Sequence, residues 1–143
     1  MPQVHNWANY AKTEAEKKKG RTPTYDEMRS MAWQCICEGA NGLVFYSFYD
    51  LKRNPGVTFD EQWDDLKQIV FEIDKVTGAL LSVDPVPKIK VKCDPQAPRW
   101  LHWTARRQNG KIYIFAVNNG NSDGKATFSI GQETKRVAVL GAE

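Results

Sequence analysis

The sequence is poor in the residues and runs that mark several protein classes. Its 143 residues include three cysteines, none in a C-x-x-C pair, and two histidines, so neither a disulfide framework nor a zinc site is indicated. No apolar run approaches the roughly 20 residues of a membrane helix. The opening MPQVHNWANY has neither an apolar signal core nor an Arg-rich presequence. We therefore predict no metal, no cofactor, no membrane partner and no signal peptide, and the localisation stays open.

Short motifs of nucleotide binding and hydrolysis are also missing. The sequence contains no G-x-x-x-x-G-K-[ST], G-x-G-x-x-G, G-x-S-x-G or H-E-x-x-H, which disfavours nucleotide binding, serine hydrolysis and zinc proteolysis. The three cysteines are predicted to be reduced thiols, with Cys35 packed in a core.

Charge is distributed unevenly along the chain, although the net charge is only +3. Residues 26–75 carry ten Asp/Glu against five Lys/Arg, and residues 76–143 carry the reverse. The basic residues of the second half alternate with apolar ones, as in residues 88–92, which is typical of the outer face of a half-exposed strand. A nucleic-acid binder would instead cluster them on one face. We predict no nucleic-acid partner.

The first half predicts a helix, a buried strand and a second helix. Thr24 and Glu27 form a capping box, and an apolar stripe with helical spacing then predicts a helix over 24–38. Residues 42–49 are apolar and aromatic on both alternating sets, which indicates a strand buried on both faces. A second capping box at Thr58 opens a helix that ends at Gly78, with Trp63 in its core stripe.

The second half follows a different period. Two prolines at 85 and 87 suggest a stiff linker, after which five strands are predicted, over 88–93, 99–107, 111–118, 124–130 and 134–140. Asn109-Gly110 is a strong hairpin signal. Trp100 and Trp103 face opposite sides of one strand, so one is assigned to the core and the other is a candidate exposed platform.

Together these patterns predict an α+β fold with two domains. Residues 1–85 correspond to a partial (β/α)8-barrel segment, helix–buried strand–helix, and residues 86–143 to a small antiparallel β-sandwich-like domain. Neither part is complete, because a barrel needs eight units and a sandwich about seven strands. The unpaired strand 42–49 therefore predicts self-association through its edge.

Five segments resemble one enzyme family. They are Pro2–Trp7, the R-x-P-T-x-x-E-M-R pattern of Arg21–Arg29, the G-A-x-G-L-x-x-Y-S-F pattern of Gly39–Phe48, the helix 60–79 and the strand Lys111–Asn118. The chain resembles the C-terminal portion of a TIM-barrel glycoside hydrolase, its last barrel units followed by an accessory β-domain. The resemblance implies hydrolysis of an oligo- or polysaccharide, normally by two carboxylates.

The resemblance also implies where the catalytic residues would lie. In many such barrels the two catalytic carboxylates end the fourth and seventh strands. Here Gln3 and His5, and no Asp or Glu, stand at the end of the predicted seventh strand. The catalytic residues therefore stay unassigned, and the isolated chain is expected to be inert.

The candidate substrate-binding residues lie at the carboxyl ends of the two barrel strands, where barrel sites are built. Trp7 would stack on a sugar, and His5 would bond a hydroxyl. Tyr46 and Tyr49 share the rim with Asp50, which is either a sugar-hydroxyl acceptor or a brace for the following loop. The alternative function is a non-catalytic carbohydrate-binding or interaction module with an exposed tryptophan on its β-domain.

Overall fold

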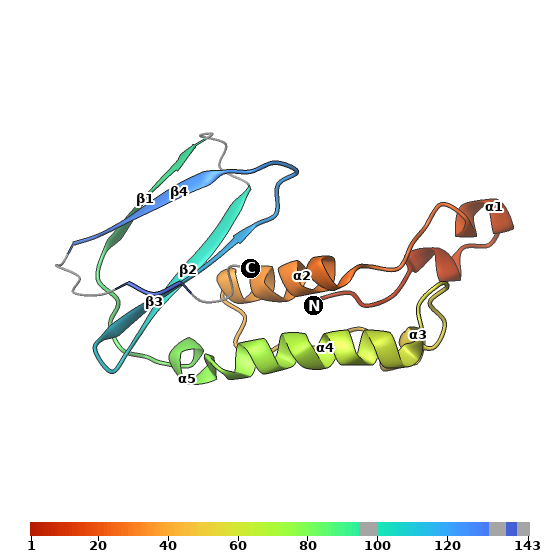
Figure 1. The fold of residues 1–143 in the computed structure, drawn as a ribbon, viewed down its shortest axis with the longest axis horizontal. Helices are drawn as coiled ribbons and strands as arrows, with labels where there is room; N and C mark the ends of the chain where they lie inside the picture. Colours follow the sequence, from red (N-terminus) through yellow and green to blue (C-terminus); the bar gives the residue numbers. More distant parts are fainter. Residues whose placement is uncertain (95–99, 132–136, 140–143) are drawn as a thin grey trace.

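The computed structural model describes residues 1–94, 100–131 and 137–139, which form a mixed α+β structure (Figure 1). We call residues 1–82 the helical part and the described residues of 88–131 the β part. The helical part contains the elements η1 (Trp7–Tyr10), α1 (Glu14–Lys17), α2 (Tyr25–Cys37), α3 (Phe48–Leu51), α4 (Phe59–Asp74) and α5 (Thr77–Leu80). The β part contains β1 (Ile89–Asp94), β2 (Leu101–Gln108), β3 (Lys111–Asn118) and β4 (Lys125–Ile130). These residues form two small antiparallel sheets and no closed barrel.

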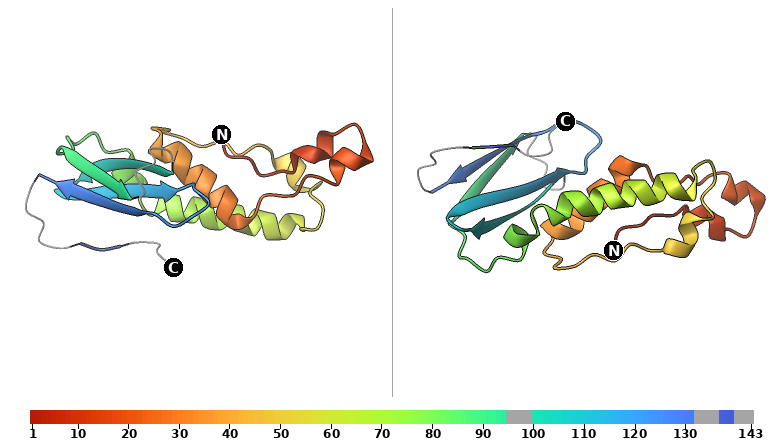
Figure 2. Two further views of the ribbon diagram at one scale, coloured as in Figure 1. Left: turned by 90° about the horizontal axis from the view of Figure 1, so that it is seen from above. Right: turned by 60° about the horizontal axis from the view of Figure 1, so that its bottom comes forward.

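The two long helices lie side by side and enclose the core (Figures 1 and 2). Both predicted capping boxes are present: the Thr24 and Thr58 hydroxyls accept from the backbone N–H groups of Glu27 and Glu61. Each glutamate reaches back to the backbone of its threonine, so two orphan N–H groups per helix are satisfied. The helix predicted over 24–38 is confirmed. The buried core residues are Val4, Met28, Ala32, Leu51, Leu66 and Ile69.

The second helix differs from its prediction at its end and on its inner face. It ends at Asp74, and Gly78 falls inside the short α5. The assignment of Trp63 to the core is wrong, because the buried positions of α4 are Gln62, Leu66 and Ile69. Their i, i+4, i+7 spacing defines the inner stripe and leaves Trp63 at its edge. The Trp63 ring is exposed and contacts two phenylalanine rings instead.

The predicted strand 42–49, buried on both faces, is not formed. One residue of it pairs, through a parallel bridge between Tyr46 and Gln3, and α3 already begins at Phe48. A doubly buried strand needs neighbours on both edges, whereas the hydrogen bonds of this bridge run only to residues 2–4, at 3.2 and 3.3 Å. Side chains therefore alternate: Leu43 and Phe45 pack against the core, while Val44 is exposed. The peptide bond after Tyr46 is cis.

The β part confirms four of the five predicted strands. β1 pairs with β4, and β2 pairs with β3. Asn109 and Gly110 join β2 to β3 with φ angles of 51° and 76°, the positive values that a two-residue hairpin turn requires. The fifth predicted strand, 134–140, lies outside the described residues except for 137–139, which have no regular secondary structure.

The two sheets contact each other through aromatic side chains. The Trp103 ring of β2 lies 5.5 Å from the Phe128 ring of β4, edge to face. The Trp100 ring packs against Gly124, where an added Cβ would lie 2.7 Å from the ring. Both tryptophans are half-buried, so neither provides the fully exposed platform considered above.

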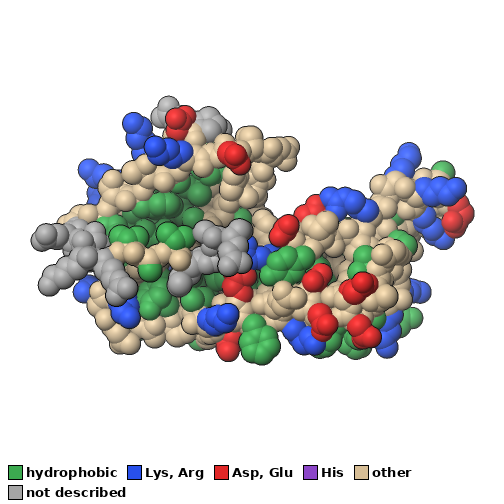
Figure 3. Space-filling model, viewed as in Figure 1, with side chains coloured by type: hydrophobic (Ala, Val, Ile, Leu, Met, Phe, Trp, Pro, Cys, Tyr) green, Lys and Arg blue, Asp and Glu red, His purple; other side chains and the backbone are tan. Residues whose placement is uncertain are grey.

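Surface charge follows the sequence pattern. Figure 3 shows Asp and Glu side chains gathered over the helical part, and hydrophobic side chains visible between the two sheets. None of the helices in the described part of the chain has both the length and the apolar composition that a membrane-spanning segment requires.

The three cysteines are free thiols. Cys37, and not Cys35 as predicted, is the buried one, because it ends α2 where that helix meets the β part. Its Sγ lies 3.6 Å from the carbonyl oxygen of Phe115 in β3. Burial raises the pKa of the Cys37 thiol to about 11, so this thiol stays protonated and unreactive at neutral pH.

Candidate functional site

The structure brings the N-terminal segment, which contains His5 and Trp7, against residues 46–54, which contain Tyr46, Tyr49 and Asp50. His5 lies at the centre of a group of aromatic rings. Its ring centroid is 4.6 Å from that of Trp7, 5.6 Å from that of Tyr46 and 5.7 Å from that of Tyr10. We call these four residues the His5 cluster. Three of its members precede α2 in the sequence and one, Tyr46, follows it, so the cluster depends on the bridge between Gln3 and Tyr46.

The His5 side chain forms the floor of this cluster. It is 1% exposed, and its Nδ1 lies 3.2 Å from the carbonyl oxygen of Tyr46. Because a carbonyl only accepts, Nδ1 carries the proton of this bond. The buried Nε2 has no hydrogen-bond partner among the described residues. The predicted hydrogen bond from His5 to a sugar hydroxyl requires an accessible imidazole ring, but the surrounding aromatic rings cover it.

Asp50 is buried beneath the cluster and holds two of its neighbours. Its carboxylate accepts hydrogen bonds from the hydroxyls of Ser47 and Tyr10. These two bonds, with the nearby charges of His5 and Arg53, lower the pKa of Asp50 below its usual range. The hydrogen bond between Tyr10 and Asp50 also raises the pKa of Tyr10. Asp50 was expected either to accept a hydrogen bond from a sugar hydroxyl or to brace the following loop, and these contacts favour the second role.

The three aromatic candidate residues are all exposed, as is Tyr10 of the His5 cluster. Trp7 is 57% exposed, Tyr46 43% and Tyr49 65%. The Trp7 indole donates a 2.6 Å hydrogen bond to the side chain of Gln3, which orients its ring. The Tyr49 ring lies outside the His5 cluster, under the guanidinium of Arg53 at 5.0 Å. The site is therefore a surface with fixed aromatic rings above a polar floor.

A buried asparagine fixes the N-terminal segment in place. Asn54 accepts from the backbone N–H of Asn6 at 2.9 Å and donates to the carbonyl of Val4 at 3.0 Å. It also donates to the side chain of Gln62 in α4 at 2.7 Å. Since each bond is buried, losing one leaves an unpaired polar group. Asn54 thus couples the position of the His5 cluster to α4.

Sequence reasoning missed three residues of this site: Tyr10, Ser47 and Asn54. Asn6 caps η1 by accepting from the N–H of Ala8, and this turn places Tyr10 near His5. The spacing Ser47-x-x-Asp50 is that of a helix N-terminus, so it could have indicated α3. Asn54 left no local signal, because its partners Val4 and Asn6 lie 50 and 48 residues away in the sequence.

The site contains a single carboxylate in direct contact with the His5 cluster, that of Asp50, as far as the described residues show. A glycosidase centre needs two, about 5–10 Å apart, so the geometry supports binding and positioning. Within the same residues, no three His, Cys, Asp or Glu side chains are grouped as metal ligands. Comparisons with protein-family models, curated proteins and solved structures found no match to this chain.

Proposed function

We propose that this chain is the C-terminal part of a barrel glycoside hydrolase and supplies part of its carbohydrate-binding rim. The observation that carries the proposal is the exposed pair Trp7 and Tyr46, held over the buried His5. Sugars present C–H faces that pack on exposed aromatic rings, and fixed rings bind with little loss of side-chain entropy.

The chain connection supports the barrel assignment. Gln3 and Tyr46 are parallel neighbours, and α2 lies in the connection between them. Parallel neighbours joined through a helix are the repeating unit of β/α barrels. His5 and Trp7 follow the first extended segment and Asp50 follows the second, and active sites of barrels lie at these carboxyl ends.

Within this proposal the residues divide into two roles. Trp7 and Tyr46 contact the sugar, and Tyr49 extends the surface beside them. Asp50 is a positioning residue, because its bonds to Ser47 and Tyr10 fix the loop that carries Tyr46. The pair of catalytic carboxylates belongs to another part of the enzyme, so this chain binds saccharide without hydrolysing it.

The alternative is a non-catalytic carbohydrate-binding or interaction module. It would use the same exposed rings of the helical part, since Trp100 and Trp103 of the β part are half-buried. Carbohydrate remains the predicted partner in both cases. Self-association along residues 42–49 also remains a prediction, with one edge of this segment already occupied by residues 2–4.

Calorimetric titration of the chain with cello-, xylo- and malto-oligosaccharides tests the proposal. We expect saturable binding of at least one probe, and the substitution Trp7→Ala should weaken it about tenfold by removing a stacking ring. Trp63→Ala is the matched control, because Trp63 is also exposed but lies outside the His5 cluster, and it should leave the affinity unchanged. Absence of binding to all probes, or equal affinity after Trp7→Ala, would overturn the proposal.

A further inference from the structure

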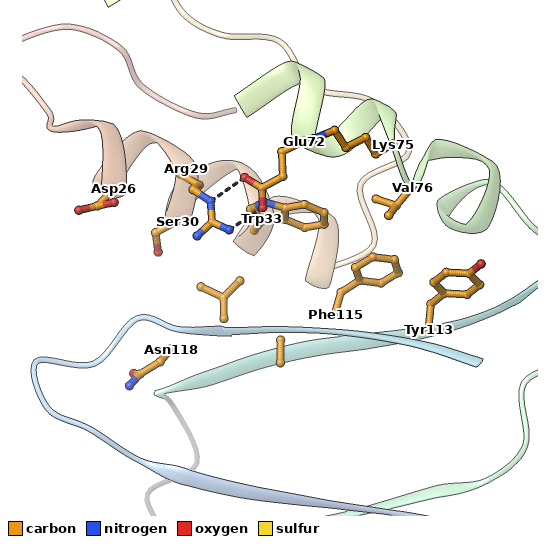
Figure 4. Close-up of a pocket in the computed structure, with 12 residues that line it drawn as sticks. Asp26, Arg29, Ser30, Trp33, Glu72, Lys75, Val76, Tyr113, Phe115 and Asn118 are labelled. Carbon is orange, nitrogen blue, oxygen red and sulfur yellow. Dashed lines mark hydrogen bonds and ion pairs between the residues drawn. The ribbon is translucent and has the colours of Figure 1, made fainter. Parts of the chain in front are cut away.

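A cavity lies between the helical part and the β part, away from the surface formed by the His5 cluster. It has a volume of about 630 Å³ and is lined by α2, the end of α4 and β3 (Figure 4). Sites for small molecules commonly have volumes of about 300–1,000 Å³. None of its lining residues belongs to the His5 cluster, so it constitutes a separate candidate site.

The wall formed by β3 is apolar and aromatic. Tyr113, Phe115 and Val117 line the cavity, and as alternate residues of one strand they share a face. The Phe115 ring stacks on that of Trp33 from α2, with centroids 5.6 Å apart and planes 17° apart. The Tyr113 ring continues this arrangement, 6.4 Å from Phe115 and 9° from parallel. The three rings form one aromatic surface that runs from β3 to Trp33 of α2.

The opposite wall is polar and held in a fixed geometry. Arg29 of α2 donates from Nε and Nη2 to the two carboxylate oxygens of Glu72 in α4, at 2.6 and 2.5 Å. The Trp33 indole donates to the same carboxylate at 3.1 Å. A bidentate pair of this kind fixes the guanidinium plane and leaves its Nη1 group for an acceptor on a ligand. Figure 4 shows Arg29 and Trp33 directed into the space between the helices and β3.

The residues that line the cavity carry equal numbers of positive and negative charges, and this balance indicates the class of ligand. Arg29 and Lys75 are cationic, and Asp26 and Glu72 are anionic. A site for a phosphorylated ligand would carry a cationic excess. A neutral molecule with one apolar face and a rim of hydroxyl groups matches both walls, because its face packs on the rings and its hydroxyls both donate and accept.

We propose that this cavity is a second saccharide-binding site, independent of the rim formed by Trp7 and Tyr46. The pyranose face packs on Tyr113 and the Trp33–Phe115 pair, and the hydroxyls bond Arg29 and the polar residues of the helix wall. This inference goes beyond the proposed function, because it needs neither a barrel nor the His5 cluster.

The two sites can be observed separately in one spectrum. Each contains one tryptophan with an indole N–H, Trp33 in the cavity and Trp7 at the rim. In the chain labelled with ¹⁵N-tryptophan, cello-, xylo- and malto-oligosaccharides are titrated and the indole signals are assigned by Trp→Phe variants. We expect a saturable shift of the Trp33 signal that persists in Trp7→Ala. If no probe shifts Trp33, the cavity proposal is overturned, whether or not Trp7 responds.

A pair of substitutions at one position then tests the aromatic wall. Tyr113→Ala should weaken the Kd measured at Trp33 about tenfold, whereas Tyr113→Phe, which keeps the ring, should retain binding. Lys75→Met, at an exposed position of the cavity rim, provides a variant that does not disturb the sheet, and it should weaken the same Kd. Unchanged affinity in both Tyr113→Ala and Lys75→Met would overturn the proposal.

Discussion

The helical part and the β part differ in how they bury their apolar side chains. Six residues of the helical part form a core cluster, and three of them, Met28, Ala32 and Ile69, have no exposed surface. In the β part, by contrast, every described residue is at least partly exposed. Two capped helices thus enclose a core on their own, whereas two small sheets cover only part of their inner faces.

The β part, which has little core of its own, makes several side-chain contacts with the helical part. Phe115 of β3 stacks on Trp33, and the Nδ1 of His102 in β2 lies 2.6 Å from the Glu38 carboxylate at the end of α2. Arg106 donates to the carbonyl of Leu80 at 3.2 Å. These contacts join polar and aromatic groups, so the β part gains order from its attachment more than from a core of its own.

The largest expected effect comes from truncating a core residue in each part. Ile69→Ala removes three carbon atoms from a fully buried site and should lower the free energy of unfolding by about 2–5 kcal/mol. Phe128→Ala removes a larger but half-buried side chain and should cost roughly 1–2 kcal/mol. Urea unfolding followed by far-UV circular dichroism measures both. A larger loss for Phe128→Ala would show that the β part has the tighter core.

A smaller effect is expected at the helix caps. Thr58→Ala removes the cap of the long helix α4 and should cost about 1 kcal/mol of unfolding free energy. Thr13→Ala removes an equivalent capping box from α1, but this short helix contains no buried residue, so global stability should not change. Equal losses in the same urea experiment would mean that α1 is part of the cooperative core.

The smallest expected effect is the pH dependence of one exposed cap. The Arg21 guanidinium and the backbone of Thr24 lower the pKa of Glu27 from 4.5 to about 2. Between these values the unfolded chain binds the proton and the folded chain does not, so stability present above pH 4.5 is lost as the pH falls towards 2. Glu27→Gln should make the melting temperature fall less steeply over this interval. An unchanged slope would show that the Arg21–Glu27 pair adds nothing measurable, as is common for exposed pairs.

Local signals predicted the elements of this fold better than its tertiary contacts. The Thr24 and Thr58 capping boxes and the Asn109-Gly110 turn were sufficient because each acts within a few residues. Residues 42–49 have the composition of a buried strand, but strand formation depends on neighbours that composition does not reveal. Composition was also misleading at Trp63. Its hydrophobicity suggested a core position, but the neighbouring Gln62 occupies the buried face of α4.

The candidate site was also predicted only in part, because several of its contacts join residues that lie far apart in the sequence. His5, Trp7 and Tyr46 were expected near one another from the family resemblance, and the structure brings them together. Asp50 was expected at this end, but its burial depends on Tyr10, which is 40 residues away in the sequence. Pairings over such distances leave no periodic pattern in the sequence. Whether these residues bind sugar is decided by the titrations proposed above.

The bonds of Asn54 also have a consequence for the order of folding. Its partners Asn6 and Val4 are 48 and 50 residues away, whereas the caps and turns of α2 and α4 form within four residues. Closing such a long loop costs entropy before any contact is gained. The pairing of α2 with α4 closes a loop of similar length, since Arg29 and Glu72 are 43 residues apart. We therefore expect the aromatic rim to assemble together with this pairing, after the local caps and turns have formed. The surface proposed to bind carbohydrate would thus exist only once the tertiary contacts of the helical part have formed.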